Sequence, residues 1–269
     1  MAKVAFSSRL REEYEQLFNT CSIRPEKQAA VEQVVAELLE NRPRYQSVGT
    51  ETGIPWYFIA AVHSLEANRD FTRHLHNGDP LTARTVHVPA GRPRRGDPPF
   101  SWEQSATDAL ALRGIGANSD WSLAGTLYQL EGYNGWGYRL YHRHVLTPYL
   151  WSYCNHYRSG KYVADGTWSD SAVSRQCGAA VILRRMVEHG AIGFPDQPLS
   201  DPETPPLVSV YARRKPASQA VREKSETLQR WLNTFPGIFV KVDGFAGERT
   251  SNAYRRVTGH YLPGDPRMG

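Results

Sequence analysis

The chain has 269 residues, of which 40% are hydrophobic and 22% are charged, and its formal net charge is +5. This length and apolar content predict a folded protein with one large and one small domain, and they exclude a disordered chain. No apolar run approaches the roughly 20 residues of a membrane-spanning helix, so we expect no stable membrane insertion, whereas the positive charge favours a polyanionic partner.

The cysteines and the first residues narrow the class of protein further. Cys21, Cys154 and Cys177 are odd in number and widely spaced, so we expect three buried thiols and no disulfide framework. The opening MAKVAFSSRL lacks the apolar core of a secretion signal. This predicts a chain that stays in the cytoplasm of the cell that makes it until another device releases it.

Periodic apolar residues predict helices over residues 9–18, 25–40 and 54–66. The third helix places Glu66 in its last turn. The C-terminal end of a helix carries partial negative charge, and neighbouring aromatic residues offer an apolar wall, so the pKa of Glu66 should be raised. We therefore expect Glu66 to keep its proton near neutral pH, as a general acid must.

A short β-hairpin is expected directly after this helix. Residues 71–76 alternate in character, the Asn-Gly-Asp-Pro sequence at 77–80 is a strong turn signal, and residues 81–88 are extended. His74 and His76 would share one face of the first strand. With a nearby Asp or His they could form a zinc site, and this leaves a metal-dependent peptidase or amidase as an alternative.

Further helices are expected over residues 102–112, 122–131, 145–157 and 171–188. Six prolines then fall between positions 193 and 216, where they disfavour both helix interior and central strand. The sequence therefore predicts a mainly α domain over residues 1–194 with one small β-hairpin, a Pro-rich linker over residues 195–216, and a small helical domain over residues 217–269.

The segment from Glu66 to Thr85 resembles the active-site motif of phage-type lysozymes, in which a Glu is followed by an Asp and then by a Thr, with five residues between the Asp and the Thr. The resemblance implies that Glu66 protonates the glycosidic oxygen while Asp79 and Thr85 hold the attacking water. The spacing of Asp79 and Thr85 matches the motif, but twelve residues separate Glu66 from Asp79 where the family has eight. Asp70 or Asp97 therefore stays an alternative to Asp79.

Residues 128–138, YQLEGYNGWGY, resemble the Tyr-Asn-Gly segment that lines the sugar cleft of goose-type lysozymes and soluble lytic transglycosylases. Aromatic faces stack on sugar rings, and amide groups bind hydroxyl and acetamido groups. The alternative is that these aromatic rings only pack against the preceding helix. The residues expected in the cleft are Tyr133, Asn134, Trp136, Tyr138, His76 and Glu131.

The C-terminal segment resembles the small peptidoglycan-binding domain of many cell-wall hydrolases. Leu-Gln at 228–229 and Asp-Gly-Phe at 243–245 are followed by Gly247 and Thr250, with Ala246 inserted. A glycine turn that leads into a Thr-started helix accounts for most of this motif as scaffold.

Taken together, the resemblances imply an endolysin with lysozyme-like fold: a monomeric muramidase that cleaves the β-1,4 bond between N-acetylmuramic acid and N-acetylglucosamine. Its partner would be bacterial peptidoglycan and not nucleic acid, and no cofactor or metal is expected. Such a protein would remain in the host cytoplasm until its release to the periplasm or cell wall. The alternatives are a lytic transglycosylase, the zinc-dependent enzyme described above, and a wall-binding protein without catalysis.

Overall fold

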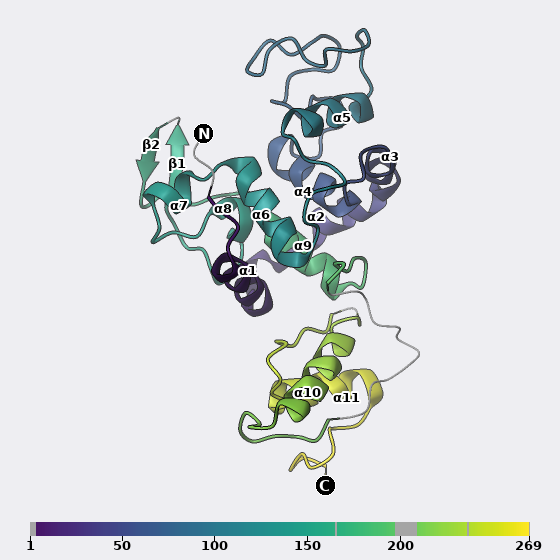
Figure 1. The fold of residues 1–269 in the computed structure, drawn as a ribbon, viewed down its shortest axis with the longest axis vertical. Helices are drawn as coiled ribbons and strands as arrows, with labels where there is room; N and C mark the ends of the chain where they lie inside the picture. Colours follow the sequence, from purple (N-terminus) through teal and green to yellow (C-terminus); the bar gives the residue numbers. More distant parts are fainter. Residues whose placement is uncertain (1–3, 165, 197–208, 236, 269) are drawn as a thin grey trace. The chain divides into compact units, whose positions relative to one another are not determined.

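The structure, a computed structural model, describes residues 4–164, 166–196, 209–235 and 237–268. This part of the chain is mostly helical, with one small antiparallel sheet, and the expected mainly α class is confirmed at that level (Figure 1). The chain divides into two compact units, one made of Met1–Tyr14 and Cys21–Leu183, the other of Glu15–Thr20 and Arg184–Gly269. The central part of the predicted linker, residues 197–208, lies outside the described residues.

Ten helical segments belong wholly or partly to the first unit, as far as the structure describes it. They are α1 (Ser8–Thr20), η1 (Pro25–Lys27), α2 (Gln28–Glu40), α3 (Arg42–Thr52), α4 (Trp56–Glu66), α5 (Trp102–Leu112), α6 (Leu123–Asn134), α7 (Gly137–Tyr141), α8 (Pro148–Trp151) and α9 (Ala179–Glu188). The division between the units passes through α1 and α9.

Helix α4 forms the centre of the first unit. Every residue from Tyr57 to Leu65 is buried, and the helix packs against α3 and α6. A helix that is apolar on all sides must be surrounded by other elements, which explains this position. Gly53 joins α3 to α4 with a φ of 70°, and a Cβ there would lie 2.5 Å from the Cβ of Ala117, so only glycine fits.

Several predicted helices are confirmed, whereas two helices of the first unit, α3 and α7, were not predicted. Helix α5 has the predicted bounds, because Ser101 and Gln104 form a capping box at its start. Helix α3 was not predicted, since it buries only Tyr45 and Val48 and its sequence has little apolar periodicity.

Two predicted helices are shorter than expected. Only Pro148–Trp151 of residues 145–157 is helical, and Tyr153 soon follows with a φ of 78°. Only Ala179–Glu188 of residues 171–188 is helical, because the chain before α9 makes a close backbone approach: a Cβ on Gly178 would lie 2.3 Å from the carbonyl oxygen of Leu150.

The prediction of a β-hairpin over residues 71–88 was wrong, because these residues do not form two paired strands, although the predicted turn is present. Gly78 has a φ of 79°, and a single isolated bridge joins Arg73 to Pro80. The side chain of Asp79, and not a partner strand, accepts the backbone N–H groups of Val86 and His87. The sheet forms elsewhere, from β1 (Lys161–Ala164) and β2 (Thr167–Ser169), which Figure 1 shows beside α7.

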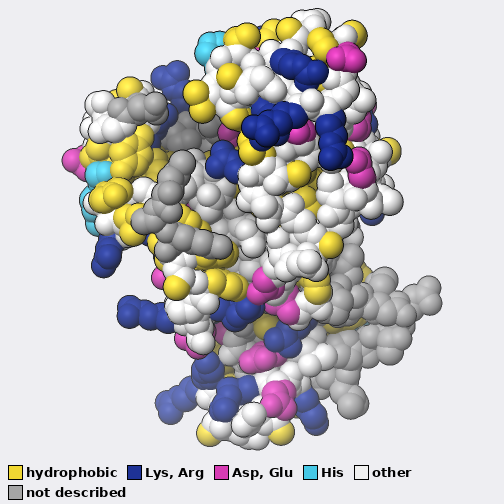
Figure 2. All heavy atoms as spheres, turned by 45° about the horizontal axis from the view of Figure 1, so that its top comes forward, with side chains coloured by type: hydrophobic (Ala, Val, Ile, Leu, Met, Phe, Trp, Pro, Cys, Tyr) yellow, Lys and Arg dark blue, Asp and Glu magenta, His cyan; other side chains and the backbone are white. Residues whose placement is uncertain are grey.

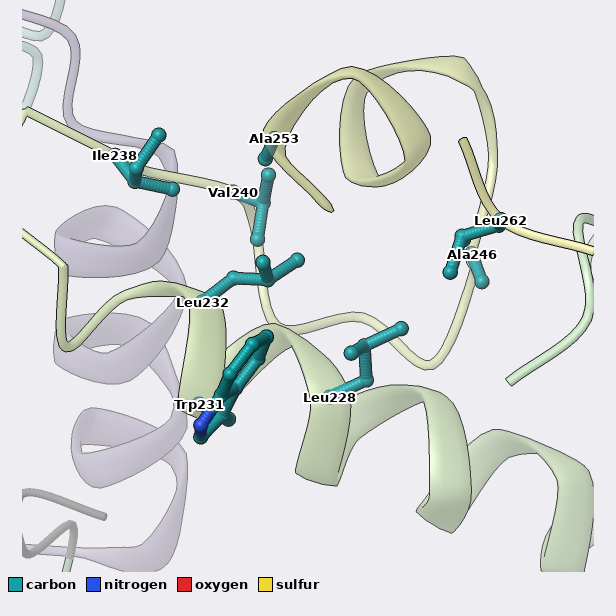
Figure 3. Packing of buried hydrophobic residues seen from close by; sticks show 8 residues of the cluster. All are labelled: Leu228, Trp231, Leu232, Ile238, Val240, Ala246, Ala253 and Leu262. Carbon is teal, nitrogen blue, oxygen red and sulfur yellow. The ribbon is translucent and has the colours of Figure 1, made fainter. Parts of the chain in front are cut away.

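The second unit contains α10 (Gln219–Leu232) and α11 (Glu248–Thr258), which pack against each other. Leu228, Trp231 and Leu232 point from α10 into a small core (Figure 3). The other members of this core are Ile238, Val240, Ala246, Ala253 and Leu262.

Gln229 fastens this core together. Its Oε1 accepts the backbone N–H groups of Asp243 and Gly244 at 2.9 and 3.0 Å, and its Nε2 donates to Asp243 Oδ1 at 2.9 Å. Gly244 has a φ of 68° and lies against Arg222, so the turn requires glycine. The Leu-Gln and Asp-Gly-Phe motifs therefore serve as scaffold, as the sequence suggested.

The surface carries many charged side chains. Figure 2 shows Lys and Arg side chains spread over the face that it presents, with hydrophobic side chains between them. Within the described residues, no helix combines the length and the apolar character that a membrane crossing requires.

Candidate active site

Glu66 ends α4 with its side chain exposed to solvent on one side. The hydroxyl group of Tyr149 donates a hydrogen bond to Glu66 Oε1 at 2.9 Å. Surrounding protein atoms raise the pKa of the Glu66 carboxyl group, while the Tyr149 hydrogen bond and the Arg113 charge oppose that shift in part. The result is a carboxylic acid that is reachable from solvent and holds its proton more strongly than a free Glu.

Tyr133 and Arg113 complete the surroundings of this acid. The guanidinium carbon of Arg113 lies 4.7 Å from the ring centre of Tyr133. Burial raises the pKa of Tyr133, and the negative charge of Glu66 raises it further. Burial and the same charge raise the pKa of Tyr149 well above its usual value. Both phenols therefore stay protonated beside Glu66, and the Tyr149 hydroxyl is the one that donates to its carboxylate.

The end of α4 is fixed by a buried histidine. His63 Nδ1 lies 3.0 Å from the hydroxyl of Tyr45, and its Nε2 lies 3.3 Å from the carbonyl oxygen of Asp70. Burial lowers the pKa of His63 to about 4, so the ring is neutral and its Nε2–H donates to Asp70. Asn68 and Arg69, with φ of 48° and 65°, turn the chain directly after Glu66.

The predicted sugar-binding segment separates into two parts at the end of α6. Tyr133 is buried on the side of Glu66. Asn134, Trp136 and Tyr138 instead line a hollow of about 780 Å³ together with Tyr162 of β1. The last turn of α6 thus connects the surroundings of the acid to an aromatic hollow of the size that small-molecule sites have.

Trp136 and Tyr138 are packed more deeply than a pair of open stacking platforms. Each exposes 8% of its surface. Trp136 lies 4.8 Å from the ring of Tyr128, and a Cβ on Gly132 would come within 3.0 Å of it. Most of the surface of Trp136 is therefore covered by packing against α6, which is the alternative to sugar stacking that the sequence left open.

Glu131 is a buried member of a charged cluster. Its Oε2 accepts from the Tyr14 hydroxyl at 2.5 Å and from Arg139 Nε at 2.8 Å. Arg139 also contacts Glu13 at 2.9 Å. Burial raises the pKa of Glu131, and Arg139 and Tyr14 counteract this. These contacts hold α1 and α7 against α6, and they occupy the Glu131 carboxylate with hydrogen bonds inside the protein.

The carboxylate of Asp79 is occupied by its own loop. Its Oδ2 accepts from the backbone N–H groups of Val86 at 2.8 Å and His87 at 3.0 Å, and its Oδ1 lies 2.6 Å from His87 Nδ1. The hydrogen bonds from His87 are the main reason that the pKa of Asp79 is well below its usual range. A carboxylate in this state is a weak base.

Thr85 has a similar structural role. It is buried, its hydroxyl donates to the carbonyl oxygen of Pro89 at 2.5 Å and accepts from the N–H of Arg92 at 2.9 Å. The residues that contact Glu66 and those that contact Asp79 and Thr85 come from different segments. The contacts therefore do not bring the three motif residues into one hydrogen-bonded group.

Asp70 and Asp97, the two alternatives to Asp79, also make local contacts. Asp70 accepts from the N–H and hydroxyl of Thr72, at 2.9 and 2.6 Å, and these bonds lower its pKa. The side chain of Asp97 is 97% exposed and lies 3.6 Å from Arg84.

His74 and His76 join a buried polar network. Ser105 Oγ lies 2.8 Å from His74 Nδ1 and 3.4 Å from His76 Nδ1, and His76 Nε2 lies 2.8 Å from Asp108 Oδ2. Burial lowers the pKa of His76. The two imidazoles do not converge on a common point with other ligands: within the described residues, no three His, Cys, Asp or Glu side chains are grouped for a metal ion. All three cysteines are buried thiols, as predicted.

Sequence reasoning missed Tyr149 and Arg113. Tyr149 follows Pro148 in a stretch that was predicted as the inside of a longer helix, and Arg113 follows the last residue of α5. Neither belongs to a recognisable motif, because both reach Glu66 through the tertiary fold. Comparisons of the chain with protein-family models, curated proteins and solved structures found no match. The resemblances described above therefore depend on the motif residues alone.

Proposed function

We propose that the protein cleaves the β-1,4 bond between N-acetylmuramic acid and N-acetylglucosamine in peptidoglycan, with Glu66 as the general acid. The observation that carries this proposal is the solvent-accessible carboxyl group with raised pKa at the end of α4, held by the Tyr149 hydroxyl at 2.9 Å. Protonating a leaving-group oxygen requires a carboxylic acid that keeps its proton near neutral pH.

The residues around Glu66 support a glycan substrate. Tyr133 and Tyr149 offer neutral phenols, and Arg113 offers a cation that favours the ionised form of Glu66 after proton transfer. The aromatic hollow beyond Asn134 provides a site for neighbouring sugar rings. A C-terminal domain that holds the wall would keep the acid close to its substrate.

Hydrolysis as a muramidase requires a group that holds the attacking water, and the sequence assigns this role to Asp79 and Thr85. The occupied oxygens and lowered pKa of Asp79 favour a second candidate, a lytic transglycosylase, in which the muramic acid hydroxyl attacks internally and one acid suffices. The two reactions differ in their products. Hydrolysis adds water to the reducing end, whereas transglycosylation leaves a 1,6-anhydro end.

Purified peptidoglycan digested in oxygen-18 water tests both the activity and its type. Mass spectrometry of the soluble fragments should show cleaved glycan, with labelled reducing ends for hydrolysis or unlabelled anhydro ends for transglycosylation. Glu66→Gln should lower the rate by about 100-fold or more, because it keeps size and polarity but removes the transferable proton. A Glu66→Gln variant that retains a tenth of the wild-type rate would contradict the proposal. The matched control is Glu51→Gln, which changes another exposed Glu in the same way and should leave the rate unchanged.

A further inference from the structure

The loop between residues 84 and 97 presents an apolar tip to solvent. Val86 is 75% exposed and Val88 is 90% exposed, the highest values among the exposed large hydrophobic side chains of the described residues. Isolated exposed valines are common on protein surfaces. Two on one loop tip, with Pro89 directly after them, form a projecting apolar edge.

The same loop carries cations that have no partner within the described residues. Arg94 and Arg95 are exposed, and neither makes a hydrogen bond, ion pair or ring contact with the described part of the chain. The exposed acid of the loop, Asp97, lies 3.6 Å from Arg84. In Figure 1 this loop lies above α5, and Figure 2, in which the top of that view comes forward, shows hydrophobic and Lys or Arg side chains together in that region.

The tip is held in place by the interior of the loop. Asp79 accepts the backbone N–H groups of Val86 and His87, and Thr85 bonds to the backbone of both Pro89 and Arg92. Arg84 donates to the carbonyl oxygens of Pro93 and Gly96. A loop that is fastened internally presents its outer side chains with little further ordering cost on binding.

We propose that residues 86–95 dock on an anionic lipid surface. The valines would enter the boundary between headgroups and acyl chains, and Arg94 and Arg95 would contact lipid phosphates. Charge alone would suit any polyanion, including nucleic acid or a wall polymer. Such polymers, however, offer no apolar layer in which the two exposed valines could be buried. The combination of an apolar tip and exposed guanidinium groups on the same loop fits a lipid surface, which offers both chemistries.

Binding of the full chain to vesicles tests this proposal independently of glycan cleavage, because vesicles contain no peptidoglycan. Co-sedimentation should show binding to vesicles that contain phosphatidylglycerol and much weaker binding to pure phosphatidylcholine. Val86→Ser with Val88→Ser should weaken the affinity by about tenfold or more without changing net charge. The matched control is Val173→Ser with Val210→Ser, which removes two other exposed valines, 49% and 62% exposed, and should leave the affinity unchanged.

The arginines have a control of equal charge. Arg94→Gln with Arg95→Gln should weaken vesicle binding by about tenfold or more, whereas Arg213→Gln with Arg214→Gln removes the same charge from an exposed pair elsewhere and should have a much smaller effect. Thermal unfolding of each variant checks that the fold is kept. The proposal is overturned if the Val86 and Val88 changes leave the vesicle affinity unchanged, or if the two arginine pairs lower that affinity by the same factor. It is also overturned if duplex nucleic acid binds more tightly than the anionic vesicles.

Discussion

Through one hydrogen bond, Tyr149 opposes the rise in the pKa of Glu66 that burial causes. Its hydroxyl group donates to the carboxylate and so favours the ionised form, which holds the pKa of Glu66 below the value that burial alone would give. If Glu66 is the general acid, as proposed, it is active while protonated, so activity should be present below the pKa of Glu66 and should be lost as the pH rises through it.

Tyr149→Phe should therefore raise the pKa of Glu66 further. We expect the alkaline limb of the rate profile on soluble glycan to move to higher pH. Tyr153→Phe is the matched control, because its hydroxyl donates to the carbonyl oxygen of Arg175 and not to a carboxylate. A shift of the limb to lower pH would show that another group, and not Glu66, controls it.

Asp79 gives a second test at this scale, because its hydrogen bonds to the backbone of Val86 and His87 indicate that it holds the loop in place. Asp79→Asn should lower the rate on soluble glycan by less than about tenfold, in contrast to the 100-fold or larger loss for Glu66→Gln. It should also speed hydrogen exchange at the amides of Val86 and His87, whose acceptor it weakens. A rate loss as large as that of Glu66→Gln in a folded variant would restore Asp79 to the role of base.

At the scale of elements, the packing of α10 on α11 depends on one buried amide. Gln229 is 1% exposed and holds the turn at Asp243 and Gly244 against α10. Removing it leaves two backbone N–H groups without their acceptor, and each buried unsatisfied group costs about 1–3 kcal/mol. The turn and the start of α11 would lose their attachment to α10.

Gln229→Ala should therefore lower the free energy of unfolding of the second unit by about 2 kcal/mol or more. Gln219→Ala is the matched control in the same helix, because Gln219 is exposed and its side chain donates to the exposed Glu223 one turn further along. Chemical denaturation with hydrogen-exchange mass spectrometry of residues 219–262 measures both. Equal stability of the two variants would contradict the anchoring role of Gln229.

At the scale of the whole molecule, the two cores have separate residues. The core of the second unit uses residues between Leu228 and Leu262, while Glu66 and the tyrosines around it belong to the first unit. Deletion of residues 217–269 removes that second core completely. The proposed chemistry at Glu66 does not use any of the deleted residues.

We expect the truncated chain to cleave small soluble glycan within about threefold of the full-length rate and to clear whole sacculi at least tenfold more slowly. Tethering a binding domain raises the effective concentration of an insoluble substrate without changing the chemical step. The full-length Gln219→Ala variant serves as the intact reference. Loss of activity on the soluble substrate would show that the deleted residues contribute to the site.

The sequence by itself determined the local features of this protein. The apolar periodicity of residues 54–66 predicted a helix with Glu66 at its end, and the same kind of pattern predicted α5 with its observed bounds. The Asn-Gly pair at 77–78 predicted a turn that is present. These features are decided by residues within a few positions of each other, so periodicity and turn chemistry are enough to predict them.

The tertiary structure alone decided which groups meet. Tyr149 and Arg113 reach Glu66 from distant segments, and no local pattern marks them. The strands expected after the helix did not form, because the side chain of Asp79 took the backbone N–H groups that a partner strand would have bound. Side-chain contacts between segments far apart in sequence compete with local propensity, and their outcome depends on how the helices pack.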